Sequence, residues 1–257
     1  NGGDIEIRDD DYRVVCMNDD TSGILFKDED SFYFTCYCRT GGLYDGLGGT
    51  LDNPIGPAVA DNGESVEVCP DMMWCGSVWE MDLNALDEWI TYNEGEDNVL
   101  QDIRGITLYP RPAVANYRFI IENVSNLSGV KRLCASISGM ASEMCPATLM
   151  CGSRCATLPL KADAAGDDCI EGRFLTFGLP KSPESANILT LYVWLNDGKK
   201  LRYDFDVTKQ ARNAKDPMNV SLIVGGIELP PSDPVGGEGG LDVSIDGWIT
   251  EIIDIQS

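Results

Sequence analysis

The side chains that most often do chemistry in proteins are unevenly represented in this chain. Its 257 residues include 42 Asp and Glu, 19 Lys and Arg, ten Cys and no His. Without histidine, neither a Ser-His nor a Cys-His catalytic dyad can form, and zinc sites that use imidazole are excluded. Enzyme chemistry would have to rely on carboxylates, lysine or tyrosine alone.

The cysteines do not form a recognisable metal-binding or redox motif. Five lie on each side of Pro112: Cys16, Cys36, Cys38, Cys69 and Cys75, then Cys134, Cys145, Cys151, Cys155 and Cys169. No pair has the Cys-x-x-Cys spacing, and Cys151 and Cys155 are too isolated to form a metal-binding knuckle. Each half has an odd number, so the ten cannot all pair within two independent halves. We expect mostly free, buried thiols, with one or two disulfides as the alternative and no metal site.

Two kinds of side chain could bind a ligand without catalysis. Acidic clusters occur at residues 9–11, 19–20 and 28–30, but the EF-hand spacing with its central glycine is absent. We expect solvated turn residues there, with a calcium site as the alternative. Trp74 and Trp79 are candidates for an aromatic platform that stacks on sugar rings, although most tryptophans in sheet proteins fill core or edge volume.

No residue is predicted to be catalytic, cofactor-binding or metal-binding, and no cofactor is expected. A hydrolase that uses only carboxylates needs two of them across a cleft, and the sequence singles out no such pair. Asn123, Asn126 and Asn219 each begin a glycosylation sequon, a weak signal because two of them lie near predicted strands. We expect a protein that is not an enzyme.

The charge is strongly negative and unevenly distributed. The formal net charge is −23 at pH 7; the residues up to Pro112 carry 24 acidic and 6 basic side chains (−18), and the rest carry 18 and 13 (−5). Such a surface repels phosphate groups, which argues against nucleic acid or anionic lipid as the main partner. No apolar run reaches the roughly 18 residues of a membrane-spanning helix.

The segment from Ile188 to Val207 is the clearest structural signal in the chain. It reads ILTLYVWL, then NDG, then KKLRYDFDV, and its second half alternates strictly between apolar and polar residues. This pattern predicts a β-hairpin whose return strand has one buried face. A three-residue loop, Asn196-Asp197-Gly198 with Gly198 left-handed, is favoured over a two-residue loop because it pairs Val193 with Leu201. That register leaves Tyr192 and Trp194 on the outer side, where they need cover from a neighbour or a ligand.

Short strand-like runs separated by Gly, Pro, Asn and Asp recur along the whole chain. They predict an all-β protein of two tandem β-sandwich domains, residues 1–112 and 113–257, joined at the proline-stiffened segment Pro110-Arg111-Pro112. The only helical spacing is that of Leu83, Leu86 and Ile90. Residues 141–168 are rich in small residues and unpatterned, so they are expected to form a long loop or an irregular insertion.

Several segments, in order along the chain, resemble the FimB-like fimbrillin-associated anchor lipoproteins, which are outer-membrane surface proteins of anaerobic gut and oral bacteria. Tyr12–Asp19 ends in Asn-Asp like the opening strand of that family, and Pro70–Trp74 is similar to its Pro-Asp-x-x-Trp/Tyr segment. Further matches are Ile106–Pro112, Ile137–Met140, Gly172–Gly178, Asp206–Thr208, and Gly240-Leu241 with Gly247-Trp248.

This resemblance implies a fold, a location and a partner. The fold would be two transthyretin-like sandwiches in tandem, with the N-terminal one acidic. The protein would be anchored by lipid to the outer membrane and exposed at the cell surface. It would act as a fimbrial (pilus) anchor or accessory subunit in assembly and adhesion, and its partners would be fimbrillin-type subunits that donate a strand to an open sheet edge.

One departure from the family concerns the first residues. Family members begin with a signal peptide, a lipidated cysteine and a strand before the Tyr12-type strand, and none of these precedes Asn1 here. Two alternatives follow: either this chain is a trimmed form and the membrane anchor lies outside it, or the first sandwich is short of a strand. The alternative function is a glycan-binding outer-membrane surface lipoprotein that uses exposed aromatic side chains.

Overall fold

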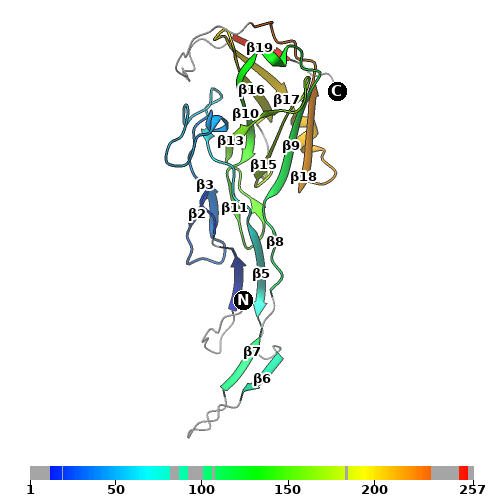
Figure 1. Ribbon diagram of the computed structural model, residues 1–257. Helices are drawn as coiled ribbons and strands as arrows, with labels where there is room; N and C mark the ends of the chain where they lie inside the picture. The colour runs from blue at the N-terminus through cyan, green and yellow to red at the C-terminus, as the bar shows by residue number, and fades with distance from the viewer. Residues whose placement is uncertain are drawn as a thin grey trace.

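Strands account for nearly all of the regular structure in this chain, as the sequence predicts. The computed structural model describes residues 12–18, 20–81, 87–91, 101–105, 108–182, 185–232 and 249–253. Its strands form two sheet pairs and one hairpin, stacked along an elongated molecule (Figure 1). Within the described residues the helices are short, namely η1 (Asp45–Leu47), η3 (Leu127–Gly129) and α1 (Thr208–Arg212). The all-β class is therefore confirmed.

The larger sheet pair is built mainly from the C-terminal part of the chain. Its six-stranded sheet has the order β19 (Ile249–Ile253), β17 (Lys200–Asp206), β16 (Ile188–Leu195), β10 (Val130–Ala141), β13 (Cys155–Lys161) and β4 (Ser65–Val66). Its four-stranded sheet has the order β14 (Asp163–Ala164), β15 (Ile170–Thr176), β9 (Ala115–Glu122) and β18 (Asn219–Gly225). Alternate side chains from both sheets, such as Phe119 and Phe205, are fully buried in one shared core. This is the packing expected when each sheet has one apolar face.

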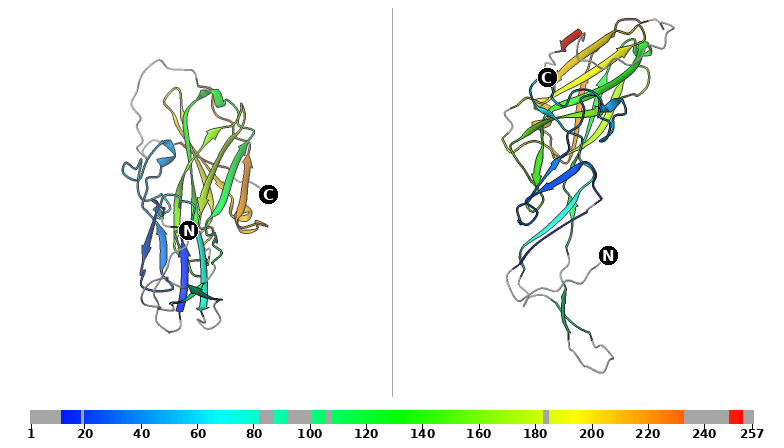
Figure 2. Two further views of the ribbon diagram at one scale, coloured as in Figure 1. Left: turned by 60° about the horizontal axis from the view of Figure 1, so that its bottom comes forward. Right: turned by 90° about the vertical axis from the view of Figure 1, so that its left-hand side faces the viewer.

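The smaller sheet pair lies next along the molecule and has its own core. One sheet has the order β1 (Tyr12–Met17), β5 (Trp74–Met81) and β8 (Arg111–Pro112); the other has the order β12 (Met150–Cys151), β11 (Glu143–Cys145), β3 (Thr35–Cys38) and β2 (Ile24–Lys27). The core includes Cys36, Met73, Cys75 and Met144. A separate hairpin of β6 (Asp87–Thr91) and β7 (Gln101–Gly105) lies beyond this pair (Figure 2).

Strand pairing crosses residue 112 in both directions. Strand β11 pairs with β3 in the smaller sheet pair and β12 pairs with β11, although both β11 and β12 follow residue 112 in the sequence. Strand β4 precedes residue 112 and pairs in parallel with β13 of the larger pair. The division into 1–112 and 113–257 stays a prediction, and each sheet pair contains segments from both sides of it.

The predicted hairpin is confirmed in its strands, its turn and its register. Val193 pairs with Leu201 and Leu191 with Tyr203 across β16 and β17. Gly198, the last residue of the three-residue loop, has a φ of 88°. Glycine adopts this left-handed conformation without steric cost. The buried face of β17 joins the core between the two sheets of the larger pair.

Tyr192 and Trp194 lie on the outer side of this sheet, and a segment far away in the sequence covers them. Tyr44, next to η1, places its ring edge-on against both, with centroid distances of 5.1 Å to Tyr192 and 5.7 Å to Trp194. Leu43 and Cys134 are buried in the same cluster. The cover that the register requires is therefore supplied by the chain itself, from residues around 43–60.

Two expectations about secondary structure were wrong in part. Residues 141–168 contain four strands instead of one long loop, and the longest is β13. Strand β13 lacks alternation because both of its faces are buried, so Ala156 to Leu160 are all inaccessible. In the predicted helix, Ile90 lies in strand β6, while Leu83 and Leu86 lie outside the described residues. Helix α1 was not anticipated from the sequence.

Candidate binding surfaces

An exposed aromatic cluster lies on the smaller sheet pair. Trp79 on β5 contacts Phe32 and Tyr33 edge-on, with ring centroids 5.3 Å and 5.7 Å away. Phe32 and Tyr33 are themselves 5.2 Å apart, and the guanidinium of Arg13 lies 5.7 Å from the Phe32 ring centre. Tyr33 and Trp79 remain about half exposed. Exposed, mutually braced rings of this kind can stack on an apolar ligand face.

Trp74, the other predicted platform residue, does not belong to this cluster. It is as exposed as Trp79, but it lies five positions away on the same strand, before the irregularity in the pairing of β5 with β1 between Val78 and Met81. No ring contact joins them among the described residues. Phe32 and Tyr33 were not among the predicted residues, and the only signal for them is two adjacent aromatic residues directly after an acidic turn.

The edge of strand β18 is closed by a side chain. The carboxamide of Gln210 on α1 donates to the Ile223 carbonyl at 2.9 Å and accepts from the Ile223 N–H at 2.8 Å. These are the two hydrogen bonds that a residue of a neighbouring strand would make. Ile223 itself is about half exposed, so the contact covers the backbone but not the side chain. Nothing in the sequence pattern pointed to this role of Gln210.

Strand β1 presents the opposite situation at the edge of the smaller pair. Within the described part of the chain, β5 is the only strand that pairs with it. Its residues Val14, Val15, Cys16 and Met17 are neither fully buried nor fully exposed, although all four are apolar. An apolar edge strand whose outer backbone groups pair with no described strand is a template for strand addition.

A buried carboxylate joins the two sheet pairs. Glu67, just after β4, is only 4% exposed, and its Oε1 accepts hydrogen bonds from Ser65 and Ser142, both at 2.9 Å. Arg154 lies 3.3 Å from the same oxygen and also bonds Ser142 and Glu143. Burial raises the pKa of Glu67 above its usual value, against the opposing effect of these hydrogen bonds and of Arg154. Its Oε2 is buried and has no hydrogen-bond partner among the described residues.

All ten cysteines are free thiols, in line with the expectation of mostly free thiols. Four of them are buried, namely Cys36, Cys38, Cys75 and Cys134, and the other six are partly accessible. Burial raises the pKa of Cys36 and of Cys75 to about 12, so these thiols remain protonated at neutral pH. A protonated thiol is a poor nucleophile and a poor metal ligand, which fits a packing role for these side chains.

The remaining predicted residues occupy structural positions where the structure describes them. Residues 28–30 lie in the turn between β2 and β3, where Asp28 has a φ of 60° and its carbonyl accepts from the Ser31 N–H. The amide of Asn126 donates to the Leu229 carbonyl at 2.6 Å, and that of Asn219 to Asp216 at 2.8 Å. The acidic cluster at 9–11 and Asp19 lie outside the described residues.

In the described ranges, no group of three or more Cys, Asp or Glu side chains is placed to hold a metal ion. Across the same ranges, none of the helices combines the length and the apolar character needed to cross a membrane.

The sequence itself matches a known family model. That model, described as a domain of unknown function (DUF5119), covers residues 1–161, more than half of the chain. The chain belongs to the DUF5119 family. The matched residues extend from before β1 to the last residue of β13, so they include the whole smaller sheet pair, the covering segment around Tyr44 and part of the larger sheet pair.

Solved structures that are similar to this chain come from Bacteroides and Porphyromonas species. A candidate adhesin from Bacteroides ovatus is similar with a TM-score of 0.52 at 18% identity, covering 88% of this chain and 76% of that one. The fimbrial anchor protein Mfa2 from Porphyromonas gingivalis has a TM-score of 0.45 at 11% identity, with 84% and 69% covered. A candidate polysaccharide-binding protein (DUF1812) from Bacteroides thetaiotaomicron has a TM-score of 0.42 at 8% identity, with 86% and 70% covered. No curated protein gives a significant match.

Proposed function

We propose that this DUF5119 protein is a non-enzymatic cell-surface protein that acts as an anchor or accessory subunit in fimbria assembly and adhesion. It would consist of two transthyretin-like domains and would be held at the outer membrane by a lipid anchor outside this chain. Support comes from the sequence motifs that resemble the FimB-like family and from the fold shared with a candidate adhesin. The single observation that carries the proposal is the edge of β1.

Strand complementation would take place along this edge. Strand β1 has an apolar sequence, a free side in the described structure and a core of ten buried residues behind its sheet. A strand donated by a fimbrillin-type subunit would make the backbone hydrogen bonds that β1 lacks on that side. Its alternate side chains would cover Val14, Val15 and their neighbours.

The test uses Val14→Pro and Val15→Pro, each mixed with fimbrillin-type subunits. Because successive N–H groups of a strand point to opposite sides, one proline removes a bond to β5 and the other removes only an outward donor. We expect a complex that resists denaturant with the wild type. The variant that keeps the wild-type unfolding midpoint should lose this complex, whereas Ser221→Pro on β18 should retain it. A wild type that forms no such complex, or a folded β1 variant that binds normally, would refute the proposal.

The exposed aromatic cluster favours a second candidate function, the binding of glycans. A sugar ring stacked on Tyr33 or Trp79 would gain about 0.5–1.5 kcal/mol per ring beyond area burial, which corresponds to roughly two- to ten-fold in affinity. Glycan binding should therefore weaken by that factor in Trp79→Ala. Trp74→Ala removes an equally exposed ring outside the cluster and should have no effect. Equal losses in both variants would exclude this cluster as the site.

A further inference from the structure

A groove of about 1000 Å³ lies at the junction of the two sheet pairs. One wall is formed by η1 and the glycine-rich residues that follow it, up to residue 51. The opposite wall is formed by residues 127–133, at the start of β10, and 159–164, at the end of β13. Apolar side chains, among them Leu47, Val68 and Leu133, contribute to the lining.

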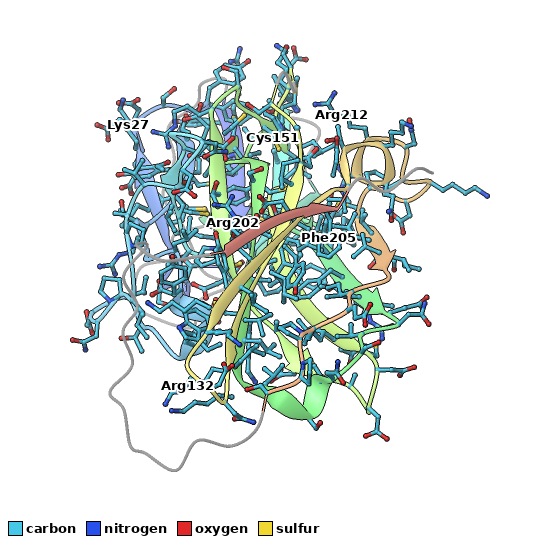
Figure 3. The ribbon with its side chains drawn as sticks, turned by 90° about the horizontal axis from the view of Figure 1, so that it is seen from above. Lys27, Arg132, Cys151, Arg202, Phe205 and Arg212 are labelled. Atoms are coloured by element: carbon cyan, nitrogen blue, oxygen red, sulfur yellow. The ribbon has the colours of Figure 1, made fainter. Side chains whose placement is uncertain are left out.

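Two positive charges at this groove have no carboxylate partner among the described residues. The pairing of β10 with β16 shifts between Val130 and Arg132, so Lys131 is an extra residue in the strand. A bulge of this kind redirects side chains, and both Lys131 and Arg132 are exposed. Figure 3 shows Arg132 at the outer rim of the molecule, apart from Arg202. In a chain of net charge −23, two adjacent cations of this kind form an unusual surface.

Three carboxylates line the groove, and each already has a partner: Asp45 and Asp71 accept hydrogen bonds from backbone amides, and Asp163 pairs with Lys161 at 3.1 Å. Asp45 accepts from the Ile55 N–H at 2.6 Å and from the Gly42 N–H at 2.8 Å. Asp71 accepts from the N–H groups of Ser22 and Gly23, at 2.6 Å and 2.7 Å. These bonds hold Asp45 to its own loop and tie Asp71 to the distant loop at Ser22 and Gly23. They leave Lys131 and Arg132 available to an external anion.

The glycine-rich wall contains backbone carbonyls that no described residue hydrogen-bonds. Gly46 is pressed against β13 so closely that a Cβ there would lie 2.0 Å from the Leu160 carbonyl oxygen. The carbonyls of residues 46–49 accept no hydrogen bond from the described residues. The N–H groups of Gly48 and Gly49, in contrast, both donate to the backbone carbonyl of Asp45. A ligand for this groove should therefore carry hydroxyl donors as well as negative charge.

We propose that this groove binds an acidic saccharide. Its carboxylates would pair with Lys131 and Arg132, its hydroxyls would donate to the carbonyls of residues 46–49, and its apolar ring face would lie on Leu133 and Val68. An acidic peptide fits less well, because a peptide that binds as an added strand would need the free edge of β13. That edge is covered by Gly46, which packs against Leu160, and by Cys69, whose thiol contacts the Pro159 carbonyl at 3.7 Å. This site is independent of strand addition at β1, and it does not involve the exposed aromatic cluster.

The experiment measures binding of an oligogalacturonide by calorimetry at low and at high salt. The double variant Lys131→Gln/Arg132→Gln is compared with Lys27→Gln/Arg173→Gln, which removes the same charge from exposed positions outside the groove. We expect salt-sensitive binding by the wild type, a loss of about ten-fold or more in the first variant, and little change in the second. The methyl-esterified oligosaccharide, which lacks the carboxylate charge, should bind as weakly to the wild type as the acid does to the first variant.

Three results would overturn the proposal. The wild type could fail to bind the oligogalacturonide even at low salt. Both double variants could lose affinity equally, which would indicate a general effect of net charge. A short polyglutamate peptide could bind the wild type as tightly as the saccharide and lose affinity in the Lys131→Gln/Arg132→Gln variant, which would assign the groove to acidic peptides.

Discussion

Removal of the Tyr44 ring tests how the covering segment is held on the larger sheet pair. In Tyr44→Ala the sheet would lose a side chain that is 1% exposed and that contacts both Tyr192 and Trp194. A buried aromatic side chain covers about 150–250 Å². At about 25 cal/mol per Å² this corresponds to roughly 4–6 kcal/mol, and measured aromatic-to-alanine changes in cores are about 3–5 kcal/mol. We therefore expect a loss of about 4 kcal/mol in the free energy of unfolding.

The assay is urea unfolding followed by circular dichroism, combined with hydrogen exchange. Exchange should accelerate at the N–H groups of Leu43 and Asp45, the residues on either side of position 44, because the segment loses its anchor on the sheet. Tyr109→Ala is the matched control, since Tyr109 is 80% exposed. Surface changes of that kind usually stay within about 0.5 kcal/mol.

A specific result would refute this reasoning. If Tyr44→Ala lost less than about 1 kcal/mol and its amides between residues 43 and 60 kept their protection, the cover on Tyr192 and Trp194 would not depend on the Tyr44 ring. The outer face of β16 would then need another explanation for its two buried aromatic side chains.

Three further predictions follow from the contacts described above. Burial raises the pKa of Glu67, so its ionisation opposes folding once the pH rises above the pKa that Glu67 has in the unfolded chain. Glu67→Gln should therefore be more stable than the wild type near neutral pH. Urea unfolding should show that this difference in stability closes as the pH falls toward 4.5. Gln210→Ala should expose the backbone of Ile223 and lower the free energy of unfolding by about 1–3 kcal/mol. Sedimentation should show concentration-dependent self-association of this variant, and the control Lys215→Ala should not self-associate. At pH 8, a thiol reagent should leave Cys36 and the other three buried cysteines unmodified in the native protein and should reach all ten after unfolding.

The parts of the fold that follow from local pattern could be predicted from the sequence. The alternation in β17 and the left-handed Gly198 determine the hairpin register, because a shift by one residue would reverse every side chain. The same register requires cover over Tyr192 and Trp194, and the structure shows that cover. The absence of histidine and the dispersed spacing of the cysteines also restrict the chemistry open to the chain, and both are properties of the sequence alone.

The parts that depend on distant contacts could not be predicted. Tyr44 lies almost 150 positions before Tyr192, and nothing in its local sequence indicates that it packs there. Strand β13 has no alternation, because both of its faces are buried, so its pattern did not distinguish a strand from a loop. The cluster of Tyr33 and Trp79 likewise exists only because the turn after β2 folds back on β5.

The treatment of sheet edges connects the fold to the proposed function. An unprotected edge strand promotes aggregation, so folded proteins cover such edges with side chains, charges or loops. The chain closes the edge of β18 with two hydrogen bonds from Gln210. Strand β1 has no such closure in the described structure, and its residues Val14 to Met17 are apolar and only partly buried. A fold that closes the edge of β18 with a dedicated side chain and leaves the apolar edge of β1 unpaired favours strand addition at β1 over addition at β18. For this reason β1, and not β18, is the edge at which a partner strand should be sought.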